Sequence, residues 1–388
     1  MKKDIYLDNS ATTKPYDKVI ESISYINKNV YGNPSSLHAK GLEAEKYIKE
    51  ARSSISKSLA VDSKEIYFTS GGTEANNLAI TGFLEANPRN GKKIITTKIE
   101  HPSVLEVYKH LIKKGYIVDF IDVDDKGIIN LESLKKAIND DTALISIIYI
   151  NNEIGTIQPI TDIVKIKNSI NREAVIHMDA VQAYGKIKIA PRKLGVDLMS
   201  ISSHKIHGPK GVGALYIRKD LKVNSVLIGG GQEFNMRSGT ENVSGISGFG
   251  LAADMTCNKL EENCLRCVKI KEYFKNRLKE EFHEDALIVS PKDSSPYILN
   301  VSFSNIRSEV LLHYLEIERI FVSTGSACSS KKNTHSHVLQ ALGMMPERID
   351  GAIRFSFSVF NSIEEIDVVI NTLKEILPKI NIKRGGKR

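Results

Sequence analysis

Short apolar runs alternate with helix-length amphipathic segments through the first half of the chain. The apolar runs have the length of buried strands and lie at 66–69, 93–97, 117–120, 143–148, 174–176, 196–201 and 212–217. Segments with a helical pattern lie at 37–59, 70–78, 103–114 and 131–138. This alternation predicts an α/β fold with a large, mostly parallel sheet covered by helices. Ligands of such sheets bind at the carboxyl ends of the strands.

A different pattern begins after about residue 250. The segment 258–281 is charged and amphipathic, and it is followed by further apolar runs at 298–303, 310–315 and 353–357. This change predicts a second, smaller α+β domain. We expect residues 15–255 to form the large domain, and residues 1–14 together with 256–388 to form the small domain, which carries a loop around Cys328.

Composition and charge bear on whether the protein binds nucleic acid or a membrane. The 388 residues carry a net charge of +8, which is spread along the chain except for a basic tail at 383–388. A solvated chain end accounts for this tail, and we expect no direct binding of nucleic acid. The apolar runs are too short to cross a membrane, and Asp4 and Asp8 interrupt any N-terminal leader segment.

The four cysteines are too few to indicate a disulfide framework. Cys257, Cys264 and Cys267 lie where the pattern is helical, and no His/Cys cluster accompanies the CxxC spacing of the last two. We therefore expect no metal site and interpret these three cysteines as structural. Both expectations fit a reducing, cytoplasmic location.

Lys205 lies on a glycine-rich turn between the predicted strands 196–201 and 212–217. Ser202 and His204 place a hydroxyl and an imidazole beside its amine. An amine in a desolvated pocket loses its proton more readily and becomes a nucleophile, and a Schiff base with pyridoxal phosphate is one use of it. A plain glycine-rich turn with a solvated lysine is the alternative, and the motif alone does not separate the two.

Two further positions suit the same cofactor. Asp179 ends the strand that starts at 174, where a carboxylate can pair with the ring nitrogen of pyridoxal phosphate. Taken alone, Asp179 is better explained as a helix cap. Thr73 follows two glycines at the start of a predicted helix, where free backbone N–H groups can bind an anion such as phosphate; an ordinary N-cap is the alternative.

Other motifs follow one another over nearly the whole chain. They lie at 6–13, 32–36, 69–76, 100–102, 151–155, 177–179, 203–205, 237–242 and 325–329. In this order they resemble the cysteine desulfurases of the NifS/IscS type, within the pyridoxal-phosphate enzymes of the aspartate aminotransferase fold. The resemblance implies that fold, pyridoxal 5′-phosphate as the cofactor, and a homodimer.

The resemblance also implies roles around the cofactor ring. Lys205 carries the cofactor as a Schiff base, Asp179 pairs with the pyridine nitrogen, and Gln182 bonds the ring hydroxyl. His101 stacks on the ring. Either His101 or Lys205 is then the base that removes the substrate's Cα proton.

The phosphate and the substrate are assigned in the same way. Thr73, Ser202 and His204 hold the phosphate, and Thr240 reaches the phosphate of the neighbouring subunit. Asn152 and Arg354 bind the carboxylate of L-cysteine, because the planar fork of arginine matches a carboxylate with two hydrogen bonds. Arg354 lies in an apolar run, so burial of its charge requires a partner.

Cys328 decides between the chemistries that this fold supports. It lies in a small, polar stretch, whereas a structural cysteine prefers apolar surroundings. By the resemblance, Cys328 attacks the substrate sulfur, L-alanine leaves, and a persulfide remains for delivery to an acceptor. Without this cysteine, an aminotransferase or a lyase would be equally suitable.

Three questions stay open at this stage. The acceptor is an iron–sulfur scaffold protein, a tRNA-thiolating enzyme or another carrier. A selenocysteine lyase and a non-catalytic protein on the same fold are the alternative functions. Lys331, Lys332 and His335 favour an acceptor with an acidic docking face, although a merely soluble loop explains them as well.

Overall fold

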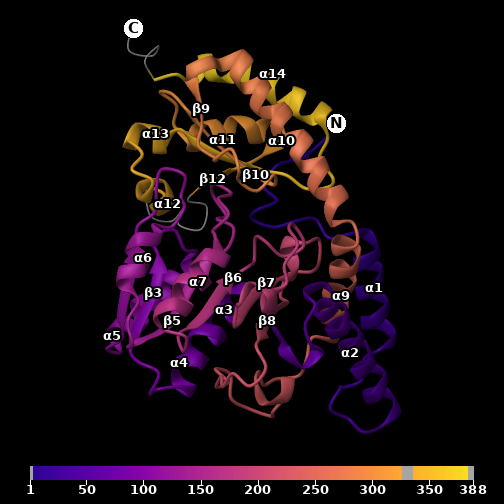
Figure 1. The fold of residues 1–388 in the computed structure, drawn as a ribbon. Helices are drawn as coiled ribbons and strands as arrows, with labels where there is room; N and C mark the ends of the chain where they lie inside the picture. Colours follow the sequence, from indigo (N-terminus) through magenta and orange to yellow (C-terminus); the bar gives the residue numbers. More distant parts are fainter. Residues whose placement is uncertain (1–2, 326–334, 383–388) are drawn as a thin grey trace.

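A computed structural model describes residues 3–325 and 335–382. It has two parts, stacked one above the other in Figure 1. We call them the large-sheet region, built on seven strands, and the small-sheet region, built on four. The first contains the α/β segment predicted from the sequence, and the second contains most of the chain beyond α9 (Val243–Cys257).

The large sheet is mostly parallel, as the alternating pattern predicts. Its strands are β2 (Ile66–Thr69), β3 (Lys93–Thr97), β4 (Ile117–Ile121), β5 (Thr142–Ile148), β6 (Val175–Asp179), β7 (Leu198–Ser202) and β8 (Gly213–Ile217). Their order across the sheet is β2-β8-β7-β6-β5-β3-β4. Only β8 runs against its neighbours, β7 and β2, because a turn at 203–212 is too short for a parallel crossover.

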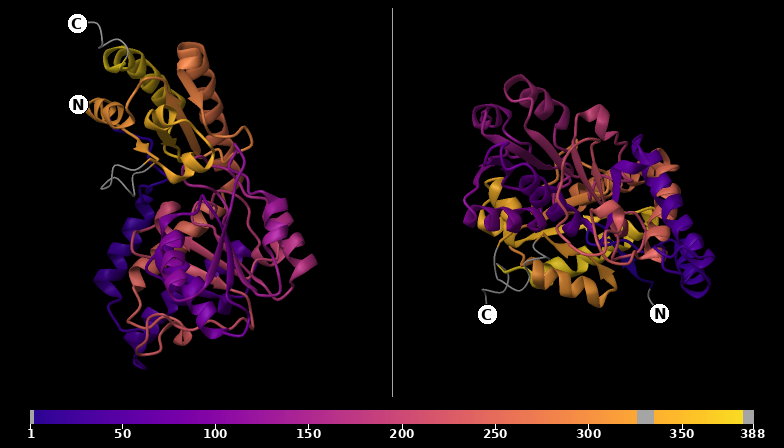
Figure 2. Two further views of the ribbon diagram at one scale, coloured as in Figure 1. Left: turned by 90° about the vertical axis from the view of Figure 1, so that its left-hand side faces the viewer. Right: turned by 90° about the horizontal axis from the view of Figure 1, so that it is seen from below.

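Helices cover both faces of this sheet, as the two further views in Figure 2 show. In chain order they are α1 (Asp17–Asn29), α2 (Ala39–Leu59), α3 (Gly72–Asn77), α4 (Phe83–Ala86), α5 (Pro102–Lys113), α6 (Leu131–Ala137), α7 (Ile160–Ile170), α8 (Pro191–Leu194) and α9. A π-helical turn, Leu78–Gly82, joins α3 to α4. α2 packs closely on α9 because Gly250 has no side chain: a Cβ there would lie 2.5 Å from the Cα of Ala51.

The small sheet is antiparallel and has the order β12-β13-β10-β9. Its strands are β9 (Ala286–Ile288), β10 (Ile298–Phe303), β12 (Ser323–Thr324) and β13 (Ala352–Ser356). Its helices are α10 (Leu260–Phe282), α11 (Ser308–Ile317), α12 (His337–Ala341), α13 (Pro346–Asp350) and α14 (Ile363–Ile380). β1 (Ile5–Tyr6) pairs with β11 (Ile320–Phe321), so the start of the chain joins this region. The domain limits given above stay a prediction.

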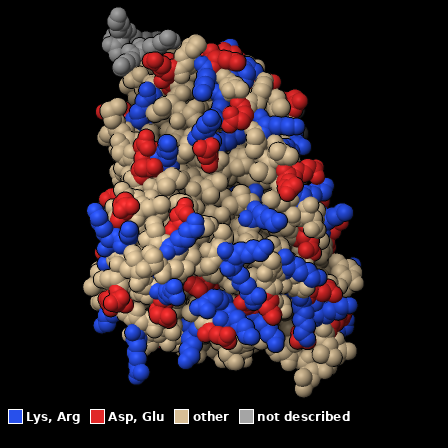
Figure 3. All heavy atoms as spheres, viewed as in Figure 1, with Lys and Arg blue, Asp and Glu red and all other residues tan. Residues whose placement is uncertain are grey.

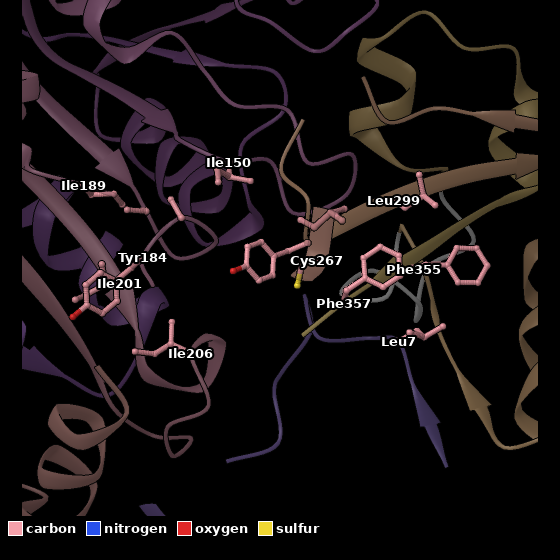
Figure 4. Packing of buried hydrophobic residues seen from close by; sticks show 14 of the residues in the cluster. Leu7, Ile150, Tyr184, Ile189, Ile201, Ile206, Cys267, Leu299, Phe355 and Phe357 are labelled. Atoms are coloured by element: carbon pink, nitrogen blue, oxygen red, sulfur yellow. The ribbon is translucent and has the colours of Figure 1, made fainter. Parts of the chain in front are cut away.

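One apolar core links the two regions. Figure 4 shows Tyr184 and Ile206 of the large-sheet region on one side, and Phe355 and Phe357 of the small-sheet region on the other. Cys267 lies between them, is fully buried, and belongs to the same cluster. Apolar burial at this boundary stabilises the contact between the two regions. The cluster includes Ile206, the residue that follows Lys205.

Neither the surface charge nor the three described cysteines indicate a further functional site. Acidic side chains lie among the basic ones across the face shown in Figure 3. Cys257, Cys264 and Cys267 are free thiols. Within the described part of the chain, no group of three or more metal-binding side chains is assembled. No helix among residues 3–325 and 335–382 combines the length and apolar character needed to span a bilayer.

Candidate functional site

The candidate residues gather at the carboxyl edge of the large sheet. Asp179 is the last residue of β6, Ser202 is the last of β7, and Lys205 ends the 3₁₀ turn Ser203–Lys205. Thr73 lies in the first turn of α3, and His101 precedes the first residue of α5. Because neighbouring parallel strands end at the same edge, the connections that follow them meet there.

The N-terminal segment covers the Lys205 amine. Lys205 Nζ donates to the carbonyl oxygens of Ser10 at 2.5 Å and Ala11 at 2.7 Å. Thr13 N–H donates to His204 O at 2.9 Å, which ties the segment to the lysine turn. Residues nearly 200 positions away in sequence therefore shield the amine from solvent.

A hydrogen-bonded chain connects Asp179 to His101. Asn76 Nδ2 donates to Asp179 Oδ2 at 2.9 Å and to Ser103 Oγ at 2.8 Å. Val181 N–H donates to the other oxygen of Asp179 at 3.0 Å. The Ser103 hydroxyl lies 2.8 Å from His101 Nδ1, which also accepts from the Ser103 N–H at 3.1 Å. Nδ1 is therefore an acceptor, and a neutral His101 carries its proton on Nε2.

Burial keeps two histidines of the site neutral. Desolvation is the main cause that lowers the pKa of His101, and the positive charge of Lys205 lowers it further while Asp179 opposes this. His204 has a pKa lowered to about 4, again chiefly by burial and then by Lys205. Its Nδ1 lies 3.1 Å from Thr12 Oγ1. A neutral imidazole accepts a proton only at its unprotonated nitrogen, and in His101 that atom is Nδ1, which Ser103 occupies.

The surroundings of Ser202 fit the phosphate group of pyridoxal phosphate. Ser202 Oγ is buried and has no hydrogen-bond partner among the described residues. A Cβ on Gly72 would lie 2.7 Å from Val181 Cγ2 and 3.7 Å from Ser202 Cβ, so glycine leaves space beside this hydroxyl. The first N–H groups of α3 point out of the same turn, and together these donors suit an anion.

The other requirements of pyridoxal phosphate are also present. A buried carboxylate, Asp179, lies where a ring nitrogen can meet it, and Lys205 supplies the amine. Gln182 Nε2 donates to Ser10 O at 2.8 Å, so its amide lies beside the same backbone oxygen as Lys205. The residues present fit this cofactor.

Arg354 contributes a buried charge from β13 of the small-sheet region. Its guanidinium pairs with Asp8 Oδ1 at 2.8 Å and donates to the carbonyl oxygen of Asn152 at 3.1 Å. Its Nε has no hydrogen-bond partner among the described residues. The partner required for burial of this charge is therefore Asp8, which the sequence pattern alone did not identify.

Thr240 is an exposed residue of a surface loop outside this cluster. Two ion pairs fasten the loop: Arg237 to Glu74 at 3.0 Å, and Arg52 to Glu233 through contacts of 2.6 and 2.9 Å. Phe234 and Asn235 of this loop have positive φ values of 57° and 67°. Because these ion pairs hold the loop in place, its exposed residue Thr240 can face a second subunit.

Cys328, Lys331 and Lys332 lie outside the described residues. Their neighbours on both sides of the chain lie against one buried carboxyl group, that of Glu153. Ser336 Oγ donates to Glu153 Oε2 at 2.5 Å, and a Cβ on Gly325 would lie 2.4 Å from the same oxygen. Burial raises the pKa of Glu153 to about 7. His335 lies 3.0 Å from Asp350.

The structure adds residues that the sequence reasoning passed over. They are Asp8, Ser10, Asn76, Glu100, Ser103 and Lys186. Asp8, Ser10, Asn76 and Glu100 lie inside the motifs 6–13, 69–76 and 100–102, so their position was a usable signal. Nothing in the sequence pairs Lys186 with Gln182 across four residues of irregular turn, because that contact depends on how the turn folds.

This fold and this site define a pyridoxal-phosphate enzyme of the aspartate aminotransferase fold type. The family model described as aminotransferase class-V matches residues 5–369. The cysteine desulfurase IscS of Dictyoglomus turgidum is 42% identical to the chain, with 98% of this chain and 96% of that protein aligned. The cysteine desulfurase IscS 1 of Archaeoglobus fulgidus is 41% identical, over 95% of this chain and 96% of its own.

Solved structures agree with these relatives. A NifS-like protein has a TM-score of 0.92 and 40% identity, covering 97% of this chain and 100% of its own. SspA in complex with cysteine has a TM-score of 0.82 and 31% identity, over 93% of this chain and 100% of its own. The chain belongs to the aminotransferase class-V family and, within it, to the cysteine desulfurases of the IscS/NifS type. Pyridoxal phosphate is its cofactor, and the predicted fold class is confirmed.

Proposed function

We propose that the protein converts L-cysteine to L-alanine and transfers the sulfur atom to Cys328 as a persulfide. The observation that carries this proposal is the convergence of Lys205, Asp179 and His101 beside Arg354 of the small-sheet region. Cysteine desulfurases are the relatives of this chain, so a selenocysteine lyase is not favoured.

Each residue around the cofactor has a separate role. Bound pyridoxal phosphate supplies an electron sink that makes the Cα proton of the substrate acidic. Lys205 holds the cofactor covalently, and Asp179 keeps its ring nitrogen protonated. The amine of Lys205 and the imidazole of His101 are the two candidate bases for the Cα proton. The Ser103 N–H occupies His101 Nδ1, the unprotonated nitrogen of the neutral ring, so Nε2 is a hydrogen-bond donor and Lys205 is the favoured base.

Arg354 and Asn152 orient the substrate. The guanidinium of Arg354 is held by Asp8 and by the backbone of Asn152, so its plane is set before the substrate arrives. A carboxylate bound to that plane fixes the amino acid relative to Lys205.

Sulfur transfer balances without an external oxidant. The Cβ–S bond of cysteine breaks, an S–S bond forms on Cys328, and Cβ gains the proton equivalent that the Cys328 thiol loses. The products are L-alanine and a persulfide. A later acceptor or thiol removes the outer sulfur atom and restores Cys328.

Replacement of Cys328 tests the sulfur-transfer step. We expect Cys328→Ala to bind the cofactor and to release no sulfide from cysteine in the presence of a thiol reductant. Sulfide and alanine release are measured together, with Cys264→Ala as the matched control that keeps activity. Full activity of Cys328→Ala, or labelled sulfur on Cys264 or Cys267, would contradict the assignment.

Replacement of Lys205 tests the cofactor linkage. We expect Lys205→Ala to lose the borohydride-reducible bond to pyridoxal phosphate, because the amine assigned to the Schiff base is removed. Intact-protein mass after borohydride treatment measures this directly. A cofactor-sized mass increase in Lys205→Ala would overturn the role of this lysine.

We also propose a homodimer, a cytoplasmic location and a protein acceptor for the sulfur. The name IscS of the relatives supports a role in iron–sulfur cluster assembly, and tRNA thiolation is the second destination. The fastened loop that exposes Thr240 supports a dimer in which each subunit completes the other's phosphate site. Light scattering, and transfer of labelled persulfide to candidate acceptors, test these points.

A further inference from the structure

A buried lysine, Lys186, lies close to the half-buried Lys205 and is not explained by the functions given above. It is 5% exposed and lies on the turn that follows β6, four residues after Gln182. Lys186 and Lys205 line the same small cavity, whose volume of about 10 Å³ is near the lower limit for one water molecule. Little solvent therefore separates the two amines.

The turn is built so that Lys186 points inward. Gly185 has a φ of +71°, a left-handed conformation that glycine adopts without cost. A Cβ on Gly185 would lie 2.7 Å from Cγ2 of Ile206, the residue after Lys205. The turn therefore packs directly on the lysine turn, and the side chain of Lys186 enters the space between them.

Lys186 contacts the residue that is assigned to the ring hydroxyl of the cofactor. Lys186 Nζ donates to Gln182 Oε1 at 2.7 Å, and Gln182 Nε2 donates to Ser10 O at 2.8 Å. Lys186 can only donate and the Ser10 carbonyl can only accept. The amide of Gln182 therefore satisfies both hydrogen bonds in one orientation only. In that orientation, the second N–H of Nε2 remains available to donate to the ring oxygen.

An aromatic ring and several charged groups surround the amine of Lys186. The Nζ atom lies 5.6 Å from the centre of the Tyr297 ring, which covers it. The titratable and charged groups that face it are Lys205, Arg354, Cys267, Tyr297, His204 and His207. Burial lowers the pKa of Lys186 to about 7, and the positive charges of Lys205 and Arg354 act in the same direction while Cys267 opposes it.

We propose that Lys186 is a positioning residue, which orients Gln182 toward the cofactor and makes the Lys205–cofactor linkage easier to deprotonate. The inference rests on the proposed function. A donor to the ring oxygen withdraws the negative charge that would otherwise hold a proton on the adjacent nitrogen. A nearby positive charge disfavours a second one, so both effects of Lys186 have the same sign.

The test is a pH titration of the visible absorption of the protein loaded with pyridoxal phosphate. We expect Lys186→Met to raise the titration midpoint by at least about half a pH unit, a threefold change in proton affinity. Lys186→Arg keeps a charged donor, so it should restore most of the wild-type midpoint. If Lys186→Met does not fold, Gln182→Leu removes the same link and should raise the midpoint in the same direction.

Lys271 offers a matched control. It is 3% exposed, burial lowers its pKa to about 7, and its Nζ donates to Ser294 Oγ and Ser295 O rather than to the site. Lys271→Met should destabilise the fold in thermal melts and leave the absorption midpoint unchanged. An unchanged midpoint in Lys186→Met or in Gln182→Leu, or an equal shift in Lys271→Met, would overturn the inference. Failure of the wild type to bind the cofactor or to release sulfide would instead overturn the proposed function.

Discussion

At the scale of single residues, Arg354 shows how a buried charge is prepared for a ligand. Its side chain lies on a central strand of the small sheet and is held by one carboxylate and one carbonyl oxygen. A single carboxylate leaves part of the fork free for a second anion. The ion pair with Asp8 therefore stabilises the arginine in the absence of substrate and keeps it in place for binding.

We expect Arg354→Lys to raise the KM for cysteine at least tenfold. An ammonium group cannot form the two parallel hydrogen bonds of a guanidinium, and charged hydrogen bonds contribute about 1.5–3 kcal/mol each. Steady-state alanine release measures the effect. Arg319→Lys is the matched control, because Arg319 pairs with Asp4 at the surface and is 51% exposed. Equal KM values in the two variants would contradict the role of Arg354.

At the scale of elements, the turns after β6 and β7 depend on each other. The first presents Gln182 and Lys186, the second presents Lys205, and they touch where Gly185 meets Ile206. The positive φ of Phe234 is likewise accompanied by local packing. Its ring contacts Tyr67 edge-on and lies 5.2 Å from the guanidinium carbon of Arg52, so these contacts offset an unfavourable backbone conformation.

We expect Gly185→Ala to destabilise the protein more than Gly115→Ala does. Both glycines have positive φ values, +71° and +88°, so each substitution costs about 1 kcal/mol in backbone strain. A Cβ at Gly115 meets open space, whereas at Gly185 it meets Ile206 and adds roughly 1–3 kcal/mol of overpacking. Urea unfolding of the two variants measures the difference, and equal losses would show that the two turns can separate freely.

At the scale of the whole molecule, buried carboxyl groups couple stability to pH. Glu100 accepts from Thr97 Oγ1 at 2.6 Å and from Ile148 N–H at 3.0 Å, and burial raises its pKa to about 8. The usual pKa of the group is 4.5. Between these values the folded protein holds a proton that the unfolded chain has lost, so stability falls as pH rises. Glu153, with a pKa raised to about 7, acts in the same direction.

We expect Glu100→Gln to gain stability over the wild type as the pH rises from 5 to 8. The amide does not titrate, so the variant escapes a loss of roughly 1.4 kcal/mol per pH unit in this window. Denaturant unfolding at several pH values measures the difference. The control is the exposed Glu132→Gln, whose difference from wild type should stay constant. A constant difference for Glu100→Gln would show that its carboxyl group is ionised in the fold.

The sequence by itself determined the α/β class, the large sheet and most of its strands. The predicted limits of β2 and β3 agree with the structure, because compact apolar runs mark buried strands wherever they occur. Because Lys205, Asp179 and His101 each follow such a run, they could be expected at one edge of the sheet, but their roles were implied by the family resemblance. The seven-residue run at β5 is buried at every position, and this continuity identifies an interior strand.

Only the tertiary structure decided how distant segments meet. The pairing of β1 with β11, the ion pair of Asp8 with Arg354, and the contact of Ser10 with Lys205 each join residues more than 190 positions apart. Hydrophobic periodicity reports which face of an element is buried, and it carries no information about which partner buries it. For that reason the sequence indicated the candidate residues for the chemistry, and the folded chain decided which residues hold them in position.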